Sequence, residues 1–161
     1  MKCPECGETM KSRREEAYRY KGAGLPNVML SGVEVRECPS CGEREVVIPR
    51  IEELHRVIAG AIITKRPRLT GDEVRFLRKV LGLSGVDFAA RVGVDPATVS
   101  RWENGHDAIG PQADRLLRLM VAVTPPKTDY ALEDLAEIED VAKPVRLRVE
   151  AQSRGWLAAV A

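Results

Sequence analysis

The sequence has few aromatic residues, no long apolar run and almost no net charge. Phe, Trp and Tyr make up 4% of the 161 residues, which argues against one large aromatic core. The longest apolar patch, residues 57–63, is far shorter than the roughly 20 residues of a transmembrane helix. Met1 leads into Cys3 without the apolar segment of a secretory signal. We therefore expect a soluble, cytoplasmic protein without a membrane partner.

The formal net charge of +1 does not indicate a nucleic-acid partner, but the charges are unevenly distributed. Residues 1–47 hold 8 basic and 8 acidic side chains, and residues 48–124 hold 12 and 9. Residues 125–161 hold 5 basic and 7 acidic side chains. A basic middle is typical of a protein whose centre binds a polyanion.

Composition divides the chain into a strand-rich start, a helical middle and an acidic end. Alternating runs bounded by Gly and Pro predict hairpin strands before Pro49. Helical spacing predicts a helix of three or four turns after Pro49 and then a basic linker. We predict an α+β protein of two domains. The segments are 1–49 for a β domain, 50–68 for the helix and linker, 69–124 for an all-α domain, and 125–161 for an acidic helix and an apolar tail.

Residues 69–124 carry start and stop signals for four helices. Ser, Thr or Asp precedes each of the first three helices, and Pro lies in the first turn of the last two. Glycine follows the first three, where a left-handed residue ends a helix. The capping residues are Thr70, Ser84 and Asp95, the prolines are Pro96 and Pro111, and the glycines are Gly82, Gly93 and Gly105.

All four cysteines lie in two copies of one turn, Cys-Pro-x-Cys-Gly, separated by residues 7–37. Pro fixes its own φ, and Gly permits the positive φ that aims backbone N–H groups at sulfur. Zn²⁺ takes four thiolates in a tetrahedron. In a reducing compartment, paired cysteines favour a metal site over disulfides. The predicted ligands are Cys3, Cys6, Cys38 and Cys41.

The cysteines could also form a redox dithiol or hold an iron–sulfur centre. A redox dithiol usually has a single Cys-x-x-Cys in a βαβ pattern, whereas this chain has two pairs on short strands. An iron–sulfur centre also accepts four thiolates. If zinc is bound, four thiolates leave no position for water, so the site is structural and holds a small domain together. Neither His55 nor His106 lies near the cysteines, and no nucleophile–base pair is evident, so we expect no enzyme.

Residues 72–123 resemble the helix-turn-helix of the Xre/Cro-like (λ-repressor-like) family, through residues 77–84, 88–89 and 92–105. Val99 and Trp102 lie three residues apart and are expected to pack inward. The rest of this helix can then meet the major groove of an operator. A solvated helix face is the alternative interpretation. The predicted DNA-contacting residues are Ala97, Thr98, Ser100, Arg101 and Asn104.

Each of these side chains suits a particular contact. Arg101 can form a bidentate pair with guanine O6 and N7, and Ala97 and Thr98 can touch a thymine methyl. Ser100 and Asn104 can reach a phosphate or a base edge. In the Xre/Cro-like family, the serine that starts the second helix, here Ser84, is usually followed directly by a Gln that contacts phosphate. The chain instead has Gly85 there. Glu103 fits the family pattern and is expected to have a structural role, bonding to nearby backbone, rather than to contact DNA.

The two parts together resemble the MqsA/YgiT-type zinc-finger antitoxins over roughly residues 1–123. The resemblance rests on the paired cysteine turns, on residues 31–38, and on Ser100 and Arg101 followed by an aromatic residue and Glu. It implies a homodimer that represses its own operon and a zinc domain that binds and neutralises a toxin. Of two base-reading residues in the family, the arginine corresponds to Arg101 and the asparagine to Ala97. The operator sequence should therefore differ, or its recognition should be weaker.

A stand-alone regulator, whose zinc-stabilised domain only dimerises or senses, is the alternative function. The end of the chain lies outside the resemblance. Spacing predicts a helix over 128–142, and alternation predicts an edge strand over 145–149 that can pair across a dimer or pack within the chain. The apolar end, 156–161, also looks like tails that bacterial proteases recognise.

Overall fold

The computed structural model describes residues 1–124 and 130–160, which form a mixed α+β protein. None of its helices has the length and hydropathy needed to cross a bilayer. Its elements, in chain order, are β1 (Lys11–Glu15), β2 (Tyr18–Arg19), β3 (Val28–Ser31), β4 (Val33–Glu37), β5 (Arg44–Val47), α1 (Ile51–Thr64), β6 (Pro67–Arg68), α2 (Gly71–Val80), α3 (Gly85–Val92), α4 (Pro96–Glu103), α5 (Pro111–Ala122), the 3₁₀ helix η1 (Leu132–Glu137), β7 (Glu139–Ala142), β8 (Leu147–Gln152) and β9 (Gly155–Val160).

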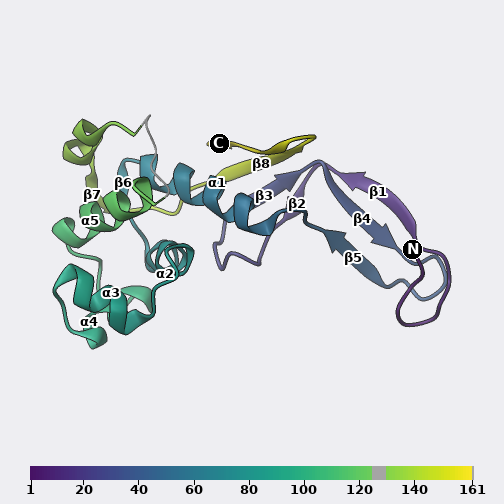
Figure 1. Ribbon diagram of the computed structural model, residues 1–161, viewed down its shortest axis with the longest axis horizontal. Helices are drawn as coiled ribbons and strands as arrows, with labels where there is room; N and C mark the ends of the chain where they lie inside the picture. The colour runs from purple at the N-terminus through teal and green to yellow at the C-terminus, as the bar shows by residue number, and fades with distance from the viewer. Residues whose placement is uncertain (125–129, 161) are drawn as a thin grey trace.

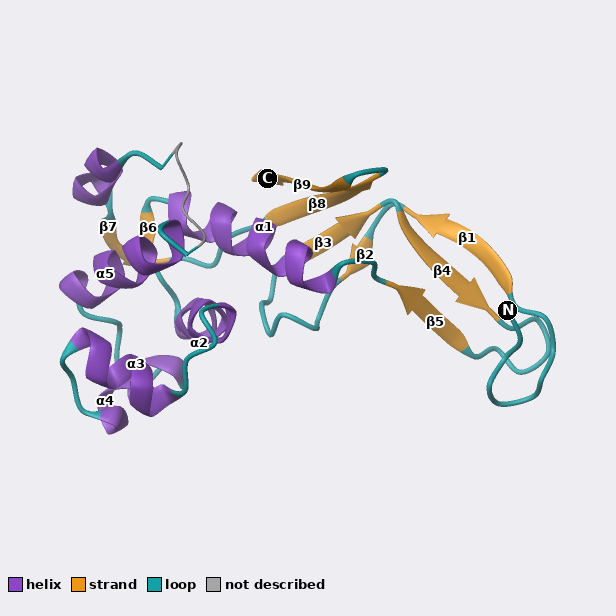
Figure 2. Ribbon diagram, in the orientation of Figure 1, coloured by secondary structure: helices purple, strands orange, loops and turns teal. Residues whose placement is uncertain are grey.

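These elements are spread along an elongated molecule (Figure 1). The N-terminus and the sheet of β1, β4 and β5 lie at one end, and α2 to α5 lie at the other. Between them, α1 runs beside a sheet in the order β2-β3-β8-β9. Figure 2 shows the division between a helical end and a β end most directly.

The three-stranded sheet is antiparallel and brings the two cysteine turns together. β4 is its centre and pairs β1 from Lys11 opposite Glu37 to Glu15 opposite Val33. Val33 and Val35 are buried while the residues between them are half-buried, which is the alternation expected of a sheet with one covered face. β4 is thus one of the hairpin strands predicted before Pro49.

The four-stranded sheet joins segments from the two ends of the chain. β3 pairs β8 in parallel, from Val28 opposite Leu147 to Ser31 opposite Glu150, and β9 pairs β8 antiparallel. The prediction of an edge strand over 145–149 was wrong, because β8 is bonded on both sides. An inner strand buries its alternate residues, and Leu147 and Val149 are both buried.

The larger of two hydrophobic clusters among the described residues runs from β4 through the central sheet to the helical end. One face of α1 supplies Leu54, Ile58 and Ile62, which are fully buried. The same cluster includes Val28 from β3 and Phe88 from α3. β2 and β3, which fall within the segment 1–49, thus share this core with the helices.

The capping signals in residues 69–124 are confirmed. Thr70 accepts a hydrogen bond from the Glu73 N–H while the Glu73 carboxylate accepts one from the Thr70 N–H, forming a capping box. Ser84 caps α3, and Asp95 caps α4 ahead of Pro96. The three predicted glycines all have φ between 71° and 73°, as a left-handed helix end requires.

The acidic end does not form the predicted helix over 128–142. Of this range, 128–129 lie outside the described residues; the rest forms η1 and then β7, which pairs with β6. The apolar residues that suggested a helix lie three apart. A period of three fits the 3.0 residues per turn of a 3₁₀ helix better than the 3.6 of an α-helix.

The predicted basic linker is also packed into the fold. Lys65 is buried, and its ammonium lies 2.6 Å from the Glu73 carboxylate. A second buried pair, Arg118 and Asp114 on α5, is 2.6 Å apart, and Arg118 donates to the carbonyls of Ile63, Lys65 and Pro67. These bonds hold the segment between α1 and α2 against α5.

Candidate metal centre and nucleic-acid interface

Two turns of identical geometry hold the four cysteines. In the first turn, the Gly7 N–H donates to the Cys3 carbonyl over 2.9 Å, and in the second the Gly42 N–H donates to the Cys38 carbonyl over 3.0 Å. Gly7 has φ of 74° and Gly42 has φ of 77°, a region that glycine enters without strain. The repeat in the sequence is therefore a repeat in backbone conformation.

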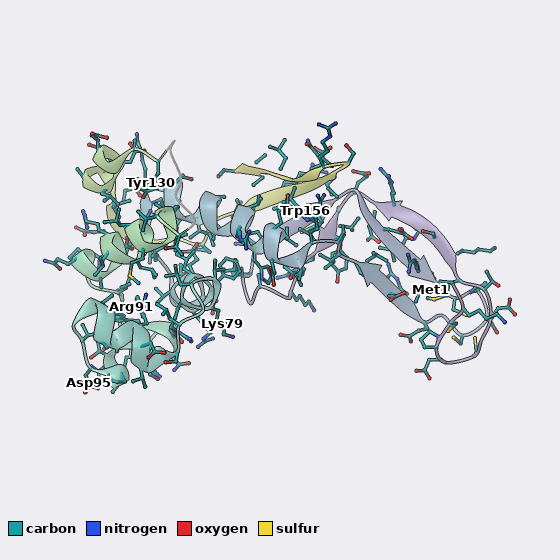
Figure 3. All side chains as sticks on the ribbon, viewed as in Figure 1. Met1, Lys79, Arg91, Asp95, Tyr130 and Trp156 are labelled. Atoms are coloured by element: carbon teal, nitrogen blue, oxygen red, sulfur yellow. The ribbon has the colours of Figure 1, made fainter. Side chains whose placement is uncertain are left out.

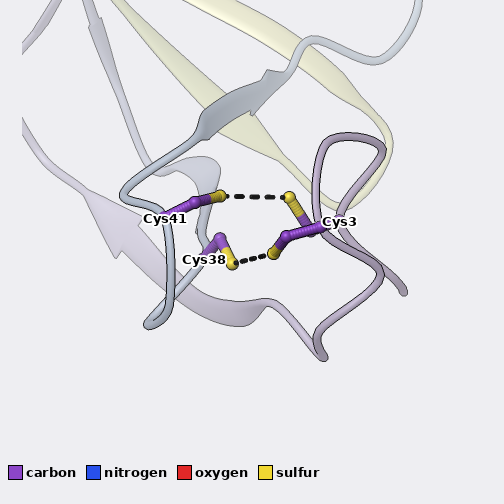
Figure 4. A group of neighbouring side chains, drawn as sticks. Cys3, Cys38 and Cys41 are labelled. Carbon is purple, nitrogen blue, oxygen red and sulfur yellow. Dashed lines mark hydrogen bonds between the residues drawn. The ribbon is translucent and has the colours of Figure 1, made fainter.

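The four sulfur atoms converge on one point (Figure 4). Cys3 Sγ lies 3.5 Å from Cys41 Sγ, and Cys6 Sγ lies 3.4 Å from Cys38 Sγ. All four sulfurs lie within 4.8 Å of one another. A tetrahedral ion with metal–sulfur bonds of about 2.3 Å needs sulfurs about 3.8 Å apart. The donor set therefore fits a tetrahedral ion, and Cys3 and Cys38 are buried while the other two are exposed.

The surroundings favour the thiolate of Cys38 and oppose that of Cys41. The backbone N–H groups of Cys41 and Ser40, which outweigh burial, lower the pKa of Cys38 to about 7. The backbone N–H of Glu43 acts to lower the pKa of Cys41, but the neighbouring thiols raise it to about 12. Four sulfurs this close repel one another when ionised, so a cation is needed for all four to be thiolates.

Neither histidine belongs to this centre. His55 lies on α1, where its Nε2 is 2.8 Å from the Tyr20 hydroxyl, and its burial lowers its pKa. His106 is exposed after α4. Sulfur supplies all the donor atoms of the cluster, which leaves no place for a reacting water if four ligands bind one ion.

At the opposite end, α3 and α4 are joined by a turn at Gly93. Ala89 of α3 is buried, and α3 and α4 are in contact. Val99 and Trp102 are buried, which confirms the predicted inward side of α4. Figure 3 shows Asp95, the capping residue of α4, at the far edge of the helical end.

Glu103 fixes α4 to α2 rather than bonding to backbone, so that part of the sequence prediction was wrong. Its carboxylate accepts from Arg78 Nε over 2.5 Å and Nη2 over 3.0 Å, and from Arg75 Nε over 3.4 Å. These bonds raise the pKa of Arg78. Arg78 also donates to the Leu83 carbonyl, which ties the end of α2 into the same network.

The predicted DNA-contacting residues lie on the outer side of α4. Ala97, Arg101 and Asn104 follow helical spacing and are all exposed, so they share one face. Ser100 beside them is exposed and Thr98 is half-buried. The structure thus brings the five residues together on one helix.

Four of these side chains, all but that of Ala97, already have hydrogen-bond partners. Arg101 forms an ion pair with Asp107, Nε to Oδ2 at 2.9 Å, and donates to the Thr98 hydroxyl over 3.1 Å. Asn104 donates to the Ser100 carbonyl at the end of the helix. Sequence reasoning missed Asp107, and its only signal was an acidic side chain just past the glycine that ends α4.

Gly85, where the family usually has Gln, has open space around it. A Cβ added there would meet no heavy atom within 4 Å, and the glycine does not have positive φ. Packing therefore does not require glycine at this position.

A family model described as "Antitoxin component of bacterial toxin-antitoxin system, MqsA" matches residues 1–124. The matched region includes both cysteine turns and all of α1 to α5. No curated protein matches the chain.

Proposed function

The chain belongs to the MqsA antitoxin family, and on this premise we propose that it is the antitoxin of a toxin–antitoxin pair and represses its own operon. The observation that carries the proposal is the match over residues 1–124, which covers the cysteine end and the helical end together. A stand-alone regulator would need only the helical end to bind DNA.

We propose that the cysteine cluster binds Zn²⁺ as a structural ion. Bound zinc would supply the positive charge that four thiolates need and would cross-link the start of the chain to the β4–β5 turn. The zinc-bound cysteines would keep the sheet of β1, β4 and β5 in its fold, and the surface of this sheet would bind the toxin. No reaction takes place at this site.

We further propose that α3 and α4 form a helix-turn-helix, that residues 69–124 act as its domain, and that α4 enters the major groove of operator DNA. Arg101 would leave Asp107 and pair with guanine O6 and N7. An ion pair between exposed side chains is weak, about 0–1 kcal/mol, so exchanging it for a bidentate base contact is favourable. Ala97, Thr98, Ser100 and Asn104 would supply the remaining contacts.

A homodimer would present two copies of α4 to a two-fold symmetric operator, as helix-turn-helix repressors do. Because the space around Gly85 is open, we infer that the absence of Gln there changes the affinity for DNA and not the fold. Operator DNA also makes the cytoplasm the expected location.

The test uses the full-length, zinc-loaded protein, DNA from upstream of its own gene, and the product of the adjacent gene. We expect protection of an inverted repeat in that DNA and a stable complex with the adjacent product, whose toxicity is lost on co-expression. DNA protection without such a complex would leave a repressor and overturn the antitoxin role. Complex formation without DNA protection would overturn autoregulation alone.

A further inference from the structure

β9 is an unguarded edge of the central sheet. It pairs only with β8 among the described strands. Its residues, Gly155–Val160, include no charge and no proline. Natural proteins block such edges with Lys, Pro, bulges or very short strands, because free N–H and C=O groups recruit another strand.

The other edges of the two larger sheets are all protected in one of these ways. β1 carries three basic residues and one acidic residue among its five. β5 begins with Arg44 and Glu45, and β2 is two residues long. The absence of charge is therefore particular to β9 among these edges.

The backbone of β9 directs hydrogen-bonding groups away from the sheet. The Leu147 N–H donates to the Asn27 carbonyl, so Leu147 turns its backbone groups towards β3. Val160 lies opposite Leu147, in a pair that does not bond across β8 and β9. By alternation, the N–H and C=O groups of Trp156, Ala158 and Val160 point outward. No described residue bonds to them.

An apolar groove of about 570 Å³ adjoins this edge, between α1 and β9. It is lined by Val57 and Ala61 of α1 and by residues 156–158 and 160 of β9. Figure 3 shows Trp156 beside α1. Val160 is 64% exposed and Leu157 is 55% exposed. A bare strand edge thus continues into uncovered apolar side chains.

We propose that β9 is the homodimer interface, with β9 of a second copy paired antiparallel to it across a two-fold axis. The two four-stranded sheets would join into one sheet of eight strands, and Val160 of each copy would be covered. A two-fold axis places the central residue of the strand opposite its own copy, and like charges placed opposite each other are destabilising. A strand without charge, with Leu157 and Ala158 at its middle, meets this requirement.

The charges around the groove agree with a second copy as the occupant. Its rim carries Glu53 and Arg56, one residue of each sign, so two copies do not repel each other through a shared excess charge. The inference rests on the proposed homodimer and specifies its surface. β9 lies beyond residue 124, where the family match ends.

The mass of the full-length, zinc-loaded protein in sedimentation equilibrium, without DNA or toxin, tests the interface. We expect twice 17.8 kDa for the natural chain. Val160→Lys puts a charge on the apolar edge, the device by which natural edge strands block pairing, and Ala158→Pro removes an outward N–H without breaking a bond to β8. Each should raise the dimer dissociation constant at least roughly tenfold, since both act on strand pairing.

Val141→Lys is the matched control, because Val141 is 56% exposed on β7 and receives the same charge. It should leave the dimer intact. A dimer that persists in Val160→Lys would overturn the interface and keep the homodimer. A monomeric natural chain would overturn both without touching antitoxin activity. If Ala158→Pro unfolds by circular dichroism, Val160→Lys decides alone. Equal weakening by Val141→Lys would also overturn the interface.

Discussion

The cysteine end and the helical end of the molecule are held together by different forces. The cysteine turns have a buried cluster of three residues, Cys3, Met10 and Cys38. The helical end shares a core that extends through α1 and the central sheet to Val33 and Val35 of β4. Because apolar burial contributes about 25 cal/mol per Å², three small residues stabilise little. The cysteine turns therefore depend on their cross-link, and the helical end does not.

The two ends also treat buried polar groups differently. The thiols of the cysteine end have mainly one another, whereas the buried charges of the helical end are fully bonded. Asp114 accepts from both Arg118 and the Leu69 N–H, and Glu73 accepts from Lys65 and the Val145 N–H. A network completed by protein groups is stable without a ligand. A cluster of four sulfurs needs an ion.

Metal removal should have the largest effect, and it should destabilise the cysteine end alone. Zinc binding contributes on the order of 10–16 kcal/mol in small zinc domains. Cys38→Ser, or a chelator, should therefore unfold the turns around residues 2–10 and 38–43 while α2 to α5 stay folded. Hydrogen exchange read by mass spectrometry should show fast exchange in the first regions and unchanged protection in the helices.

Ser40→Ala is the control, because it lies in the same turn, supplies no sulfur and keeps its backbone N–H. It should retain metal and protection. Simultaneous loss of protection in α2 to α5 would mean that the two ends fold as one unit and that the boundary near residue 49 is misplaced.

Asp114→Ala tests the helical end in the same way. It leaves Arg118 buried without its carboxylate, and an uncompensated buried charge costs about 3–5 kcal/mol. Urea denaturation followed by circular dichroism should show a lower midpoint with an unchanged slope. Asp140→Ala removes the exposed partner of Arg68 and should cost less than about 1 kcal/mol. Equal losses in the two variants would contradict a stabilising role for the buried network.

Sequence reasoning was most successful where a single residue determines local geometry. The caps Thr70, Ser84 and Asp95 formed as predicted because each makes its bond within three residues. The cysteine turns were equally clear. Their meeting in space follows from the pairing of β1 with β4, which local patterns only suggested.

The prediction failed where distant segments decide the structure. The alternation in 145–149 is the same for an edge strand and an inner strand, and only the partner β3, more than 100 residues earlier, makes β8 an inner strand. Likewise, the local sequence predicts that Lys65 lies in a linker, whereas in the fold its ammonium is buried against Glu73 and the Lys143 carbonyl. On α4, helical spacing placed Arg101 outside, but it gave no reason to expect its pair with Asp107.

Arg101→Ala tests whether DNA binding and stability depend on different residues at the helical end. Loss of a bidentate base contact should cost about 1–3 kcal/mol in operator binding. Arg101 is exposed, so the urea midpoint should not move. Fluorescence anisotropy on operator and scrambled DNA measures the effect. Unchanged operator affinity would show that another surface reads the bases.

Asp107→Asn gives the smallest expected effect and tests the ion pair that holds Arg101. The two side chains are about half exposed and 2.9 Å apart, so their interaction is worth about 0.2–1 kcal/mol. Removing the charge frees Arg101 and reduces repulsion of phosphate, so operator affinity should rise up to about fivefold. Asp140→Asn, on β7, makes the same change in net charge and is the control. The gain should vanish in the Arg101→Ala background, because there Asp107 has no guanidinium to hold. A gain that persists in that background would assign the effect to general electrostatics and leave the ion pair without a role in DNA recognition.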